Sequence, residues 1–426
     1  MTESTSFLQR LAKGRLGSLA ITLDQLAFSA AAFLLQFAGA HSSGNAAFAG
    51  FSLVTLIQTG QWYLSRAAAS ETVLVGRHLQ GSGAAVAAQR SMDTALLIGF
   101  VGSAVCLGGA ALTDGPLRWL FLMQVVASPI AAVFDHSRYL LLASGRAVHA
   151  FLLDTLWTLT MLVAVAALLV TGNLTPVAVF LSWGLALVVP TAIGFKLTGV
   201  KLPVPGRQLR AWFDQNRKLV PGFLVDAAFL TFGIYVTFAV IWLVTGDENL
   251  GLFRKALIPV TVLNVVMMGI TTVLLTTLTQ RAHRATTLRV PMLATVGGGI
   301  IALIGVLIML VLPTNLMELL FNASWDQMRP LVFVLMLYGF MQLVTQNAVT
   351  FAKSHGRSWV GPRVRGFEAV VEVTLVGVFG SLFGIIGVPW ALVAAWGLAS
   401  PIAWRAAMAS RAEPETVDPA VDVTTV

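Results

Sequence analysis

Charged residues are scarce in this sequence. Only 11% of its 426 residues are Asp, Glu, Lys or Arg, whereas 57% are hydrophobic and the mean hydropathy is +0.82. A soluble globular domain carries about 25% charged residues, so the composition excludes that class. The apolar runs are long and continuous, unlike the short alternating segments of a membrane β-barrel. The composition therefore predicts a polytopic helical membrane protein.

Cysteine and histidine are also rare. The single cysteine, Cys106, cannot form an internal disulfide, and six scattered histidines offer no metal-ligand spacing. No glycine-rich stretch has the strand-to-helix setting of a nucleotide-binding loop, and the Walker lysine motif is absent. We therefore expect no metal, no cofactor, no ATP-driven machinery and no enzyme activity.

Long apolar runs are abundant. A helix needs about 20 such residues to cross the hydrocarbon core. The sequence contains twelve runs of this kind, at residues 16–40, 46–64, 93–112, 117–136, 148–170, 176–196, 220–245, 250–279, 291–313, 328–352, 367–386 and 389–408. The first run has basic residues before it and Ala38-Gly39-Ala40 at its end, like a cleaved signal peptide. Because it is long for such a segment and contains Asp24, we interpret it as an uncleaved span.

Basic residues predict the orientation of these spans. With a cytoplasmic N-terminus, all but four of the 27 Lys and Arg fall in predicted cytoplasmic segments; the four are Arg118, Arg329, Arg254 and Lys255. Such a bias favours cytoplasmic N- and C-termini. The net charge of +8 and the pI of about 10.1 then describe loops facing anionic membrane lipids rather than a nucleic-acid partner.

The basic segment near the middle of the chain divides it into two halves. Leu209, Trp212 and Phe213 in this segment are expected to form a short helix at the membrane interface. We expect four regions: an N-terminal six-helix bundle (1–197), a basic cytoplasmic linker (198–219), a C-terminal six-helix bundle (220–408) and a disordered cytoplasmic tail (409–426).

Two acidic residues recur at matching places in the halves. Asp24 and Asp226 lie 202 positions apart in apolar stretches, and the same offset relates Phe51 to Phe253. An acid inside a membrane helix is costly and usually faces a cavity or a partner. The recurrence predicts a duplicated transporter with two pseudo-symmetric bundles around a central cavity. Either the two acids bind a coupling proton or cation or pair with a basic residue during the transport cycle, or they are structural acids near the inner interface that pair with Arg15 or a loop arginine.

Two basic residues enter the eighth predicted span. Arg254 and Lys255 precede Pro259, which is expected to interrupt the helix. A guanidinium binds phosphate in a bidentate manner, so we predict that Arg254 and Lys255 bind an anionic substrate. The alternative is that both side chains extend to the outer membrane interface.

Charged residues also gather near the inner ends of other predicted spans. Arg66, Glu71, Asp135, Arg138 and Asp154 are expected to form ion pairs that close an inward gate or anchor loops. 

Two further patterns concern single spans. Glu368 and Glu372 share one helix face and are expected to meet Arg363 or Arg365. Trp62 and Trp157 lie near span ends and are expected at the membrane interface.

Several of these segments resemble one known group. Leu23–Ser29, Phe48–Leu53, Asp135–Tyr139 and Gly251–Ala256 look like the corresponding segments of polysaccharide flippases. These belong to the multidrug/oligosaccharidyl-lipid/polysaccharide exporter superfamily. Members often carry an Ala-Arg pair where this chain has Ala40-His41.

The resemblance implies a transporter of the bacterial inner membrane. Two six-helix bundles would rock by alternating access, and a lipid-linked anionic oligosaccharide would move to the outer leaflet for cell-envelope polysaccharide synthesis. Its implied partners are that lipid-linked oligosaccharide, membrane lipids, a coupling proton or sodium ion, and envelope polysaccharide synthesis proteins.

Other functions stay open at this stage. The nearest alternative is a cation-coupled multidrug exporter of the same superfamily. A major facilitator transporter is disfavoured because residues 65–92 lack its Gly-x-x-x-Asp-Arg-type loop. A polymerase or glycosyltransferase of envelope sugars is disfavoured by the short loops, and a non-transporting scaffold is a further alternative.

Overall fold

The structure is a computed structural model. It describes residues 7–76, 79, 83–261 and 288–410, and the side chains from Ala20 onward within these ranges. Throughout the described residues, the secondary structure is helical.

The N-terminal half is built from long helices. Its elements are α1 (Phe7–His41), α2 (Asn45–Ser65), the π-helical turn η1 (Arg66–Ser70), α3 (Glu71–Val75), α4 (Ala84–Leu112), α5 (Gly115–Ala143), α6 (Ala147–Val170), α7 (Pro176–Ala186) and α8 (Val188–Thr198). Local chemistry sets several boundaries. Thr175 accepts a hydrogen bond from the Ala178 amide and precedes Pro176, which together start α7. Gly199, with φ of 69°, ends α8.

The C-terminal half follows a short linker helix, α9 (Leu209–Gln215). Its elements are α10 (Val220–Thr245), α11 (Asp247–Ala256), α13 (Arg289–Val311), α14 (Thr314–Phe321), α15 (Trp325–Ser354), α16 (Val360–Phe383), the 3-10 turn η3 (Gly384–Ile386) and α17 (Gly387–Ala409). Helix α11 ends at Ala256, the chain turns at Leu257, and helical structure resumes over residues 258–261. This is the interruption that Pro259 predicts. The rest of the eighth predicted span lies outside the described residues.

The expected spans agree with these helices. Among the described residues, nine segments are long and apolar enough to cross a membrane. One of them, Val360–Ala409, contains the last two predicted spans, α16 and α17. The second predicted span forms α2, which is more polar than the nine, and the eighth is described only in part. The third span is longer than predicted, because α4 begins at Ala84.

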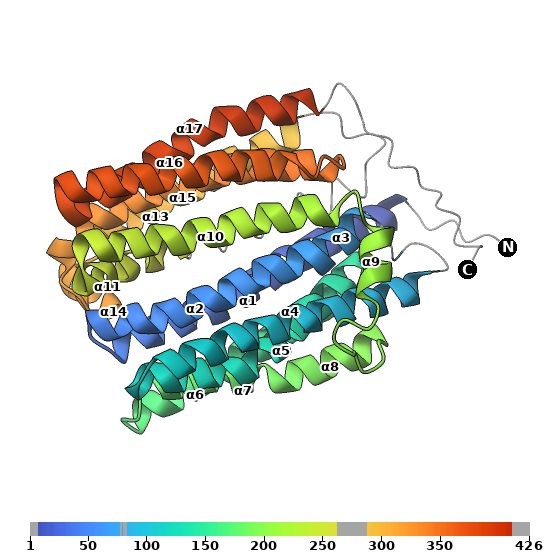
Figure 1. The fold of residues 1–426 in the computed structure, drawn as a ribbon, viewed down its shortest axis with the longest axis horizontal. Helices are drawn as coiled ribbons and strands as arrows, with labels where there is room; N and C mark the ends of the chain where they lie inside the picture. The colour runs from blue at the N-terminus through green and yellow to red at the C-terminus, as the bar shows by residue number, and fades with distance from the viewer. Residues whose placement is uncertain (1–6, 77–78, 80–82, 262–287, 411–426) are drawn as a thin grey trace.

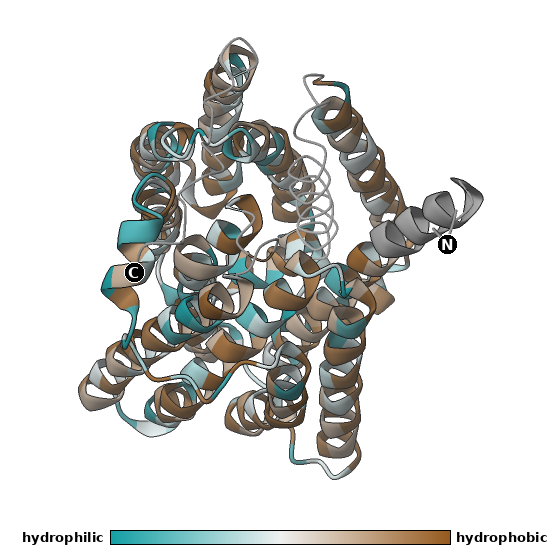
Figure 2. Ribbon diagram, turned by 90° about the vertical axis from the view of Figure 1, so that its right-hand side faces the viewer, coloured by the Kyte–Doolittle hydropathy of each residue, from teal (hydrophilic) through white to brown (hydrophobic). Residues whose placement is uncertain are grey.

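The two halves lie side by side with their helices roughly parallel to one long axis. In Figure 1, α1–α8 occupy the lower part and α10–α17 the upper part. Seen along this axis, Figure 2 shows a ribbon that is mostly hydrophobic, with hydrophilic helical segments near the centre of the bundle. Polar side chains are therefore concentrated where helices of the two halves meet.

The helix boundaries repeat between the halves. The start of α2, Asn45, and the start of α11, Asp247, are 202 positions apart. Both ends of α6 and α16 differ by 213 positions, and α7–α8 together match α17 with an offset of 211. The larger offset in the second part explains why the sequence repeat weakens after the second helix.

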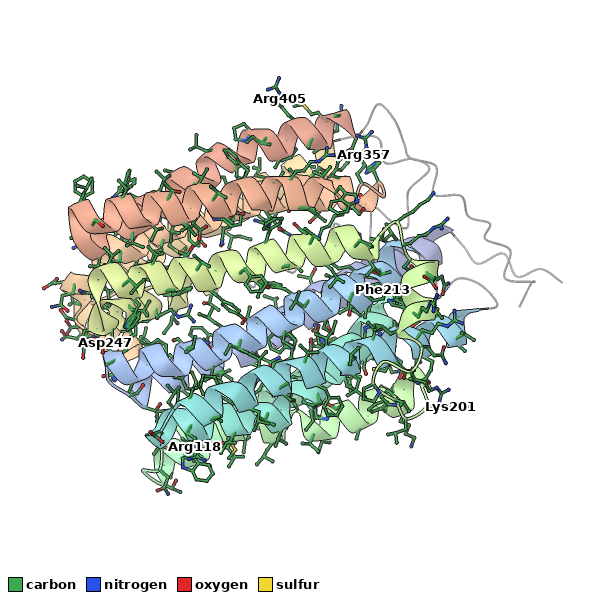
Figure 3. All side chains as sticks on the ribbon, viewed as in Figure 1. Arg118, Lys201, Phe213, Asp247, Arg357 and Arg405 are labelled. Carbon is green, nitrogen blue, oxygen red and sulfur yellow. The ribbon has the colours of Figure 1, made fainter. Side chains whose placement is uncertain are left out.

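Charged residues of the loops lie at the two ends of the bundle. Figure 3 shows Lys201, Arg357 and Arg405 at one end, together with Phe213 of the linker helix, and Arg118 and Asp247 at the other. The first end contains the segments predicted to be cytoplasmic, and we refer to it as the inner end. The opposite end, with the starts of α2 and α11, is the outer end.

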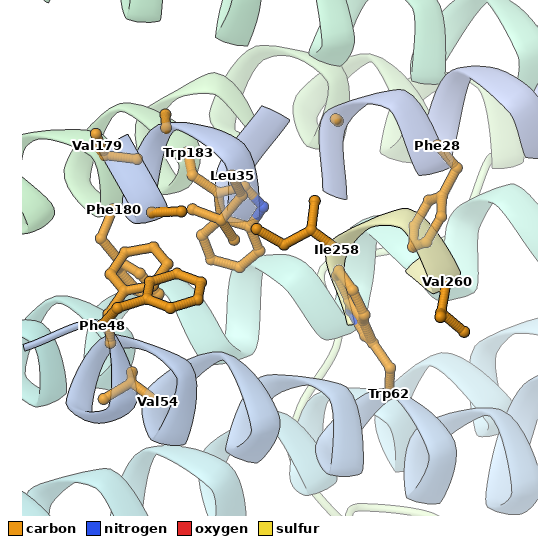
Figure 4. Close-up of a cluster of buried hydrophobic side chains, with 14 of the residues drawn as sticks. Phe28, Leu35, Phe48, Val54, Trp62, Val179, Phe180, Trp183, Ile258 and Val260 are labelled. Carbon is orange, nitrogen blue, oxygen red and sulfur yellow. The ribbon is translucent and has the colours of Figure 1, made fainter. Parts of the chain in front are cut away.

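One continuous apolar core crosses the boundary between the halves. Ile258 and Val260, which follow α11, lie among Leu35, Phe28 and Trp62 of the N-terminal half (Figure 4). Trp62 is 8% exposed. The interfacial position expected for Trp62 is therefore wrong, because its ring packs at a tilt of 55° against Phe28, with 5.1 Å between ring centroids. Trp157 is likewise fully buried, against Phe28 and Phe134.

The linker helix α9 is attached to the protein interior rather than only to the membrane surface. Trp212 is fully buried and its indole Nε1 donates to the Ala68 carbonyl, 2.8 Å away. Arg90 of α4 donates to Gln208 and Gln215 on either end of α9. The linker is thereby fixed to the inner end of the N-terminal bundle.

Two glycines of α4 provide a test of helix packing. A methyl group at Gly99 would lie 2.7 Å from Pro129 Cα of α5, whereas nothing lies within 4 Å of one at Gly108. We expect Gly99→Ala to lower stability by about 1–3 kcal/mol, because a backbone must move. Gly108→Ala should raise it by up to about 1 kcal/mol, because alanine favours the helix. Thermal unfolding of both variants in detergent checks this. Equal changes in melting temperature for the two variants would contradict the close approach of α4 to α5 at Gly99.

Candidate functional site

Arg138 of α5 is the centre of a buried ionic cluster in the N-terminal half. Its Nη2 lies 2.8 Å from Asp24 Oδ2 on α1, and its Nη1 lies 3.0 Å from Asp135 Oδ1 on its own helix. Its Nε lies 2.7 Å from Asp154 Oδ1 on α6. The guanidinium also stacks over Phe28, 4.2 Å from the ring centroid. One side chain therefore links three helices in the apolar interior.

Arg66 completes this cluster from the π-helical turn η1. Its Nε and Nη2 donate to the two oxygens of Asp135 at 2.8 and 2.7 Å, a bidentate pair. A π-helical turn leaves backbone groups without their usual helical partners and is frequent at functional sites. Here the Ala67 carbonyl accepts from Thr72 Oγ1, and the Ala68 carbonyl accepts from Trp212 of the linker.

The cluster has more acids than bases. Among the described residues, Asp24, Asp135 and Asp154 form ion pairs with two guanidiniums, those of Arg66 and Arg138, and all five residues are nearly fully buried. Asp154 is the least satisfied: the Arg138 contact lacks hydrogen-bond alignment, and no described side chain or amide donates a hydrogen bond to either carboxylate oxygen. Asp24 Oδ1 also lacks a donor. An unmatched buried carboxylate is costly, so this site favours an added proton or cation.

A second buried cluster occupies the C-terminal half. Lys353 of α15 lies 2.7 Å from Asp226 Oδ2 on α10. Its ammonium also donates to Glu71 Oε2 of α3, 3.0 Å away. Because Glu71 belongs to the N-terminal half, Lys353 joins the two halves at the inner end. Arg365 of α16 is 4.0 Å from Asp226 and 2.9 Å from Glu368.

The two clusters are related by the repeat. In each half, the acid of the first helix, Asp24 or Asp226, pairs with a base of the fourth long helix, Arg138 of α5 or Lys353 of α15. The base then contacts a second acid. The halves differ in where that acid lies: Asp154 belongs to the same half as Arg138, whereas Glu71 lies across the boundary from Lys353.

The remaining acid of α16 is held by neutral donors. Thr237 Oγ1 donates to Glu372 Oε1 at 2.7 Å, and Trp396 Nε1 donates to Oε2 at 2.8 Å. Glu368 pairs with Arg365, one of the two arginines expected for it. Arg365 also donates to Gln346 and stacks on Trp396.

Arg254 and Lys255 have different surroundings. The Arg254 guanidinium lies 4.8 Å from the Phe238 ring centroid, and its buried Nε has no hydrogen-bond partner within the part of the chain that the structure describes. Lys255 is 1% exposed and its Nζ donates to the Asn322 carbonyl, 2.8 Å away. Arg254 therefore has donors to spare for an anion, whereas Lys255 already serves the packing of α11 against the end of α14.

The arrangement separates the predicted site residues into groups. Arg66, Asp135, Arg138 and Asp154 come together with Asp24, whereas Glu71 pairs across the halves. The partner suggested for Asp24 was Arg15 or a loop arginine, but Arg138 inside α5 takes that place. 

Sequence reasoning missed Lys353 and Arg365 as site residues. Both were counted as basic residues of a cytoplasmic segment, although α15 and α16 include them. The available signal was the repeat: Lys353 opens a segment ending in Gly356-Arg357, which matches Gly145-Arg146 at the end of α5.

Removing the central guanidinium tests the cluster. We expect Arg138→Gln to lower stability by about 3–5 kcal/mol, because three buried acids would share Arg66 alone. Adding Asp154→Asn should recover part of the loss, since it removes the least satisfied acid. Arg118→Gln, at an exposed position, is the control. Thermal unfolding in detergent is measured for the three variants and the wild-type protein. An Arg138→Gln variant as stable as the wild type would contradict the role of Arg138 in the cluster.

Comparisons with known proteins were made on both sequence and structure. No family model and no curated protein matches the sequence. Solved structures do match. An outward-facing multidrug resistance MATE family transporter of the MOP superfamily shares 12% identity at a TM-score of 0.73, with 94% of this chain and 96% of that chain covered. An inward-facing structure of such a transporter shares 15% identity at a TM-score of 0.67, with 95% and 99% covered.

A third solved structure also matches. It is a MOP superfamily transporter from Pyrococcus furiosus, described as having a binding pocket of reverse polarity that suggests a different function. It shares 12% identity at a TM-score of 0.70 and covers 93% of this chain and 96% of that chain. These likenesses span nearly the whole chain. The chain is thus a multi-pass helical membrane protein with the two-bundle fold of the solved MATE transporters of the MOP superfamily.

Proposed function

We propose that this chain is a cation-coupled exporter that works by alternating access between its two halves. The observation that carries the proposal is the excess of buried carboxylates over guanidiniums around Arg138. The fold supports it, because the matched structures include multidrug resistance transporters in outward-facing and inward-facing conformations. The proposal includes a bacterial inner membrane, with both termini cytoplasmic and the halves bounded as residues 1–197 and 220–408.

The coupling site consists of Asp24 and Asp154 on either side of Arg138. When a proton or a sodium ion binds these acids, the attraction that holds Arg138 between them weakens. Arg138 links α1, α5 and α6 beside the packed rings of Phe28, Phe134 and Trp157, so its release changes the balance of contacts among the three helices. A bound cation can shift a conformational equilibrium only if it binds one state more tightly than the other. An acid pair that releases its base on cation binding supplies such a difference.

The inner contact between the halves serves as the gate. Lys353 lies between Glu71 of the N-terminal half and Asp226 of the C-terminal half, at 3.0 and 2.7 Å. Its ammonium keeps one partner within the C-terminal half when the halves separate, so opening exposes Glu71 without leaving a buried lysine unpaired. The gate therefore opens without the full cost of breaking a buried ion pair.

Drug efflux tests the coupling role. We expect Asp154→Asn to reduce cation-driven efflux of a cationic dye such as ethidium by at least about tenfold, because it removes a carboxylate that binds the coupling ion. Asp326→Asn, at an exposed outer position, is the matched control. Efflux is followed by fluorescence in cells with equal amounts of membrane-inserted protein. Efflux by Asp154→Asn at the control rate would remove Asp154 from the mechanism.

A second candidate function is supported by Arg254. Its buried Nε is unpaired, and a guanidinium with free donors suits a phosphate group. This favours a lipid-linked anionic oligosaccharide as cargo, with its lipid remaining in the bilayer and envelope polysaccharide synthesis proteins as partners. Lys255 contributes positive charge behind Arg254 in this scheme, although its ammonium is held by the Asn322 carbonyl.

Substitution of two arginines that each lie over a phenylalanine ring provides a test that distinguishes the two cargoes. Arg254 lies over Phe238, and the exposed Arg329 lies over Phe333 at 5.9 Å. If the cargo carries phosphate, Arg254→Gln should reduce translocation of a lipid-linked oligosaccharide in proteoliposomes by about ten- to a hundredfold, the loss of a charge-assisted bidentate contact. Arg329→Gln should not. Dye efflux in wild-type protein without oligosaccharide translocation would instead favour the multidrug cargo.

A further inference from the structure

His41, the last residue of α1, has an unusual pair of hydrogen-bonding partners. Its Nδ1 lies 3.0 Å from the Phe37 carbonyl oxygen, one turn earlier in the same helix. Its Nε2 lies 2.6 Å from the Leu319 carbonyl oxygen, in α14 of the other half. The ring also stacks on Phe37, with 4.3 Å between ring centroids. Both ring nitrogens thus face backbone oxygens.

Carbonyl oxygens only accept hydrogen bonds, which determines the charge of this ring. A neutral imidazole has one N–H and one nitrogen lone pair, whereas an imidazolium has two N–H groups. With a neutral ring, one of the two contacts would place a nitrogen lone pair against a carbonyl lone pair. Both contacts are favourable only for the protonated ring.

The two carbonyls belong to the C-terminal ends of two helices. Phe37 is in the last turns of α1, and Leu319 is in the last turn of α14. The Leu319 carbonyl is among the last four of α14, which lack intrahelical partners, whereas the Phe37 carbonyl precedes the last four of α1. The partial negative charge at both helix ends favours a nearby cation. His41 thus contributes a positive charge to two negative helix ends, one from each half of the protein.

This contact lies where the halves meet at the outer end. Figure 1 shows α14 with α11 and the start of α2 at that end of the bundle. A second hydrogen bond crosses the boundary beside it, from Asn322 Nδ2 to the Ala40 carbonyl at 3.3 Å. Asn322 follows α14 with φ of 48°, a left-handed conformation that asparagine tolerates. The outer ends of α1 and α14 are therefore joined through His41 and Asn322.

Few other charges surround the ring. Lys255 of α11 donates to the carbonyl of Asn322 at the same helix end, and Glu248 of α11 attracts the Lys255 ammonium. Glu318 of α14, next to Leu319, accepts a hydrogen bond from the Trp325 amide. Of the N-terminal helices that pack against α1, α2 and α7 contain no Asp, Glu, Lys, Arg or His, and the titratable residues of α6, His149 and Asp154, lie in its first third, toward the inner end. The ring itself is partly exposed, so water can exchange protons with it.

We propose that His41 is a pH-sensitive latch that holds the outer ends of the two halves together. While the ring is protonated, both carbonyl contacts form and the outer end is closed. As the external pH rises and the ring loses its proton, one contact is lost and the open arrangement gains population. The role of this contact as an outer gate depends on the proposed alternating access, whereas its pH dependence does not.

Distance measurements between the halves test the latch without any substrate. Spin labels on Ala47 of α2 and Asn315 of α14, both exposed, report the separation at the outer end in a Cys106→Ser background. Double electron–electron resonance is recorded in lipid nanodiscs at about pH 5.5 and about pH 8, on either side of the ordinary imidazole pKa. We expect the closed-to-open ratio to fall roughly tenfold at the higher pH, as for the loss of a cation at a helix end.

Two substitutions of His41 separate its role from other proton-binding groups. His41→Arg keeps a cation at both pH values and should remain closed throughout. His41→Gln keeps a neutral donor and should be equally open at both. A pH response that persists in His41→Gln would overturn the proposal, as would a wild-type ratio that does not change. Closure of His41→Arg also shows that the position tolerates substitution, so an open His41→Gln is not simply unfolded.

A transport assay distinguishes failure of the latch from failure of the proposed function. If wild-type distances respond to pH through His41 but no dye or lipid-linked oligosaccharide is moved, the latch stands and the transport role fails. If transport occurs while the His41 variants show wild-type pH responses, the latch fails and the transport role stands.

Discussion

The guanidinium of Arg138 is the interaction on which the N-terminal half depends. It is fully buried in an apolar environment and is neutralised by acids from α1, α5 and α6. A charge in this position would be prohibitive without those partners, and the partners would be equally costly without it. The same group therefore positions three helices and leaves one carboxylate in excess. In the proposed function, structural stability and cation binding arise from the same few atoms.

The C-terminal half contains an equivalent buried ion pair, but its base has a second partner in the other half. Lys353 pairs with Asp226 as Arg138 pairs with Asp24, but its second acid, Glu71, comes from the opposite half. One cluster thus stabilises a bundle and the other joins the bundles at the inner end. At the outer end, His41 and Asn322 join them again. At the outer end these hydrogen bonds lie beside close packing of α2 against α11, where Gly251 approaches the backbone of Asn45. The apolar core around Ile258 and Leu35 lies between the two ends.

Much of the architecture could be predicted from the sequence, because a membrane span imposes a minimum length of apolar residues and loops collect the basic ones. The acids Asp24 and Asp226 could be singled out for the same reason. Helix ends were less predictable: the inner ends of α15 and α16 carry Lys353 and Arg365, so these bases appeared to be loop residues. Trp62 shows a related difficulty, since a position near a span end does not specify whether the ring faces lipid or the neighbouring helix.

The central claim is that the acid excess around Arg138 carries a coupling cation. The most direct test is to impose an ethidium gradient on proteoliposomes and to follow protons and sodium with internal dyes. The account predicts that one of these ions moves against the ethidium flux, and that Asp154→Asn abolishes this movement. Ethidium flux through the wild-type protein with no counter-movement of either ion would contradict it.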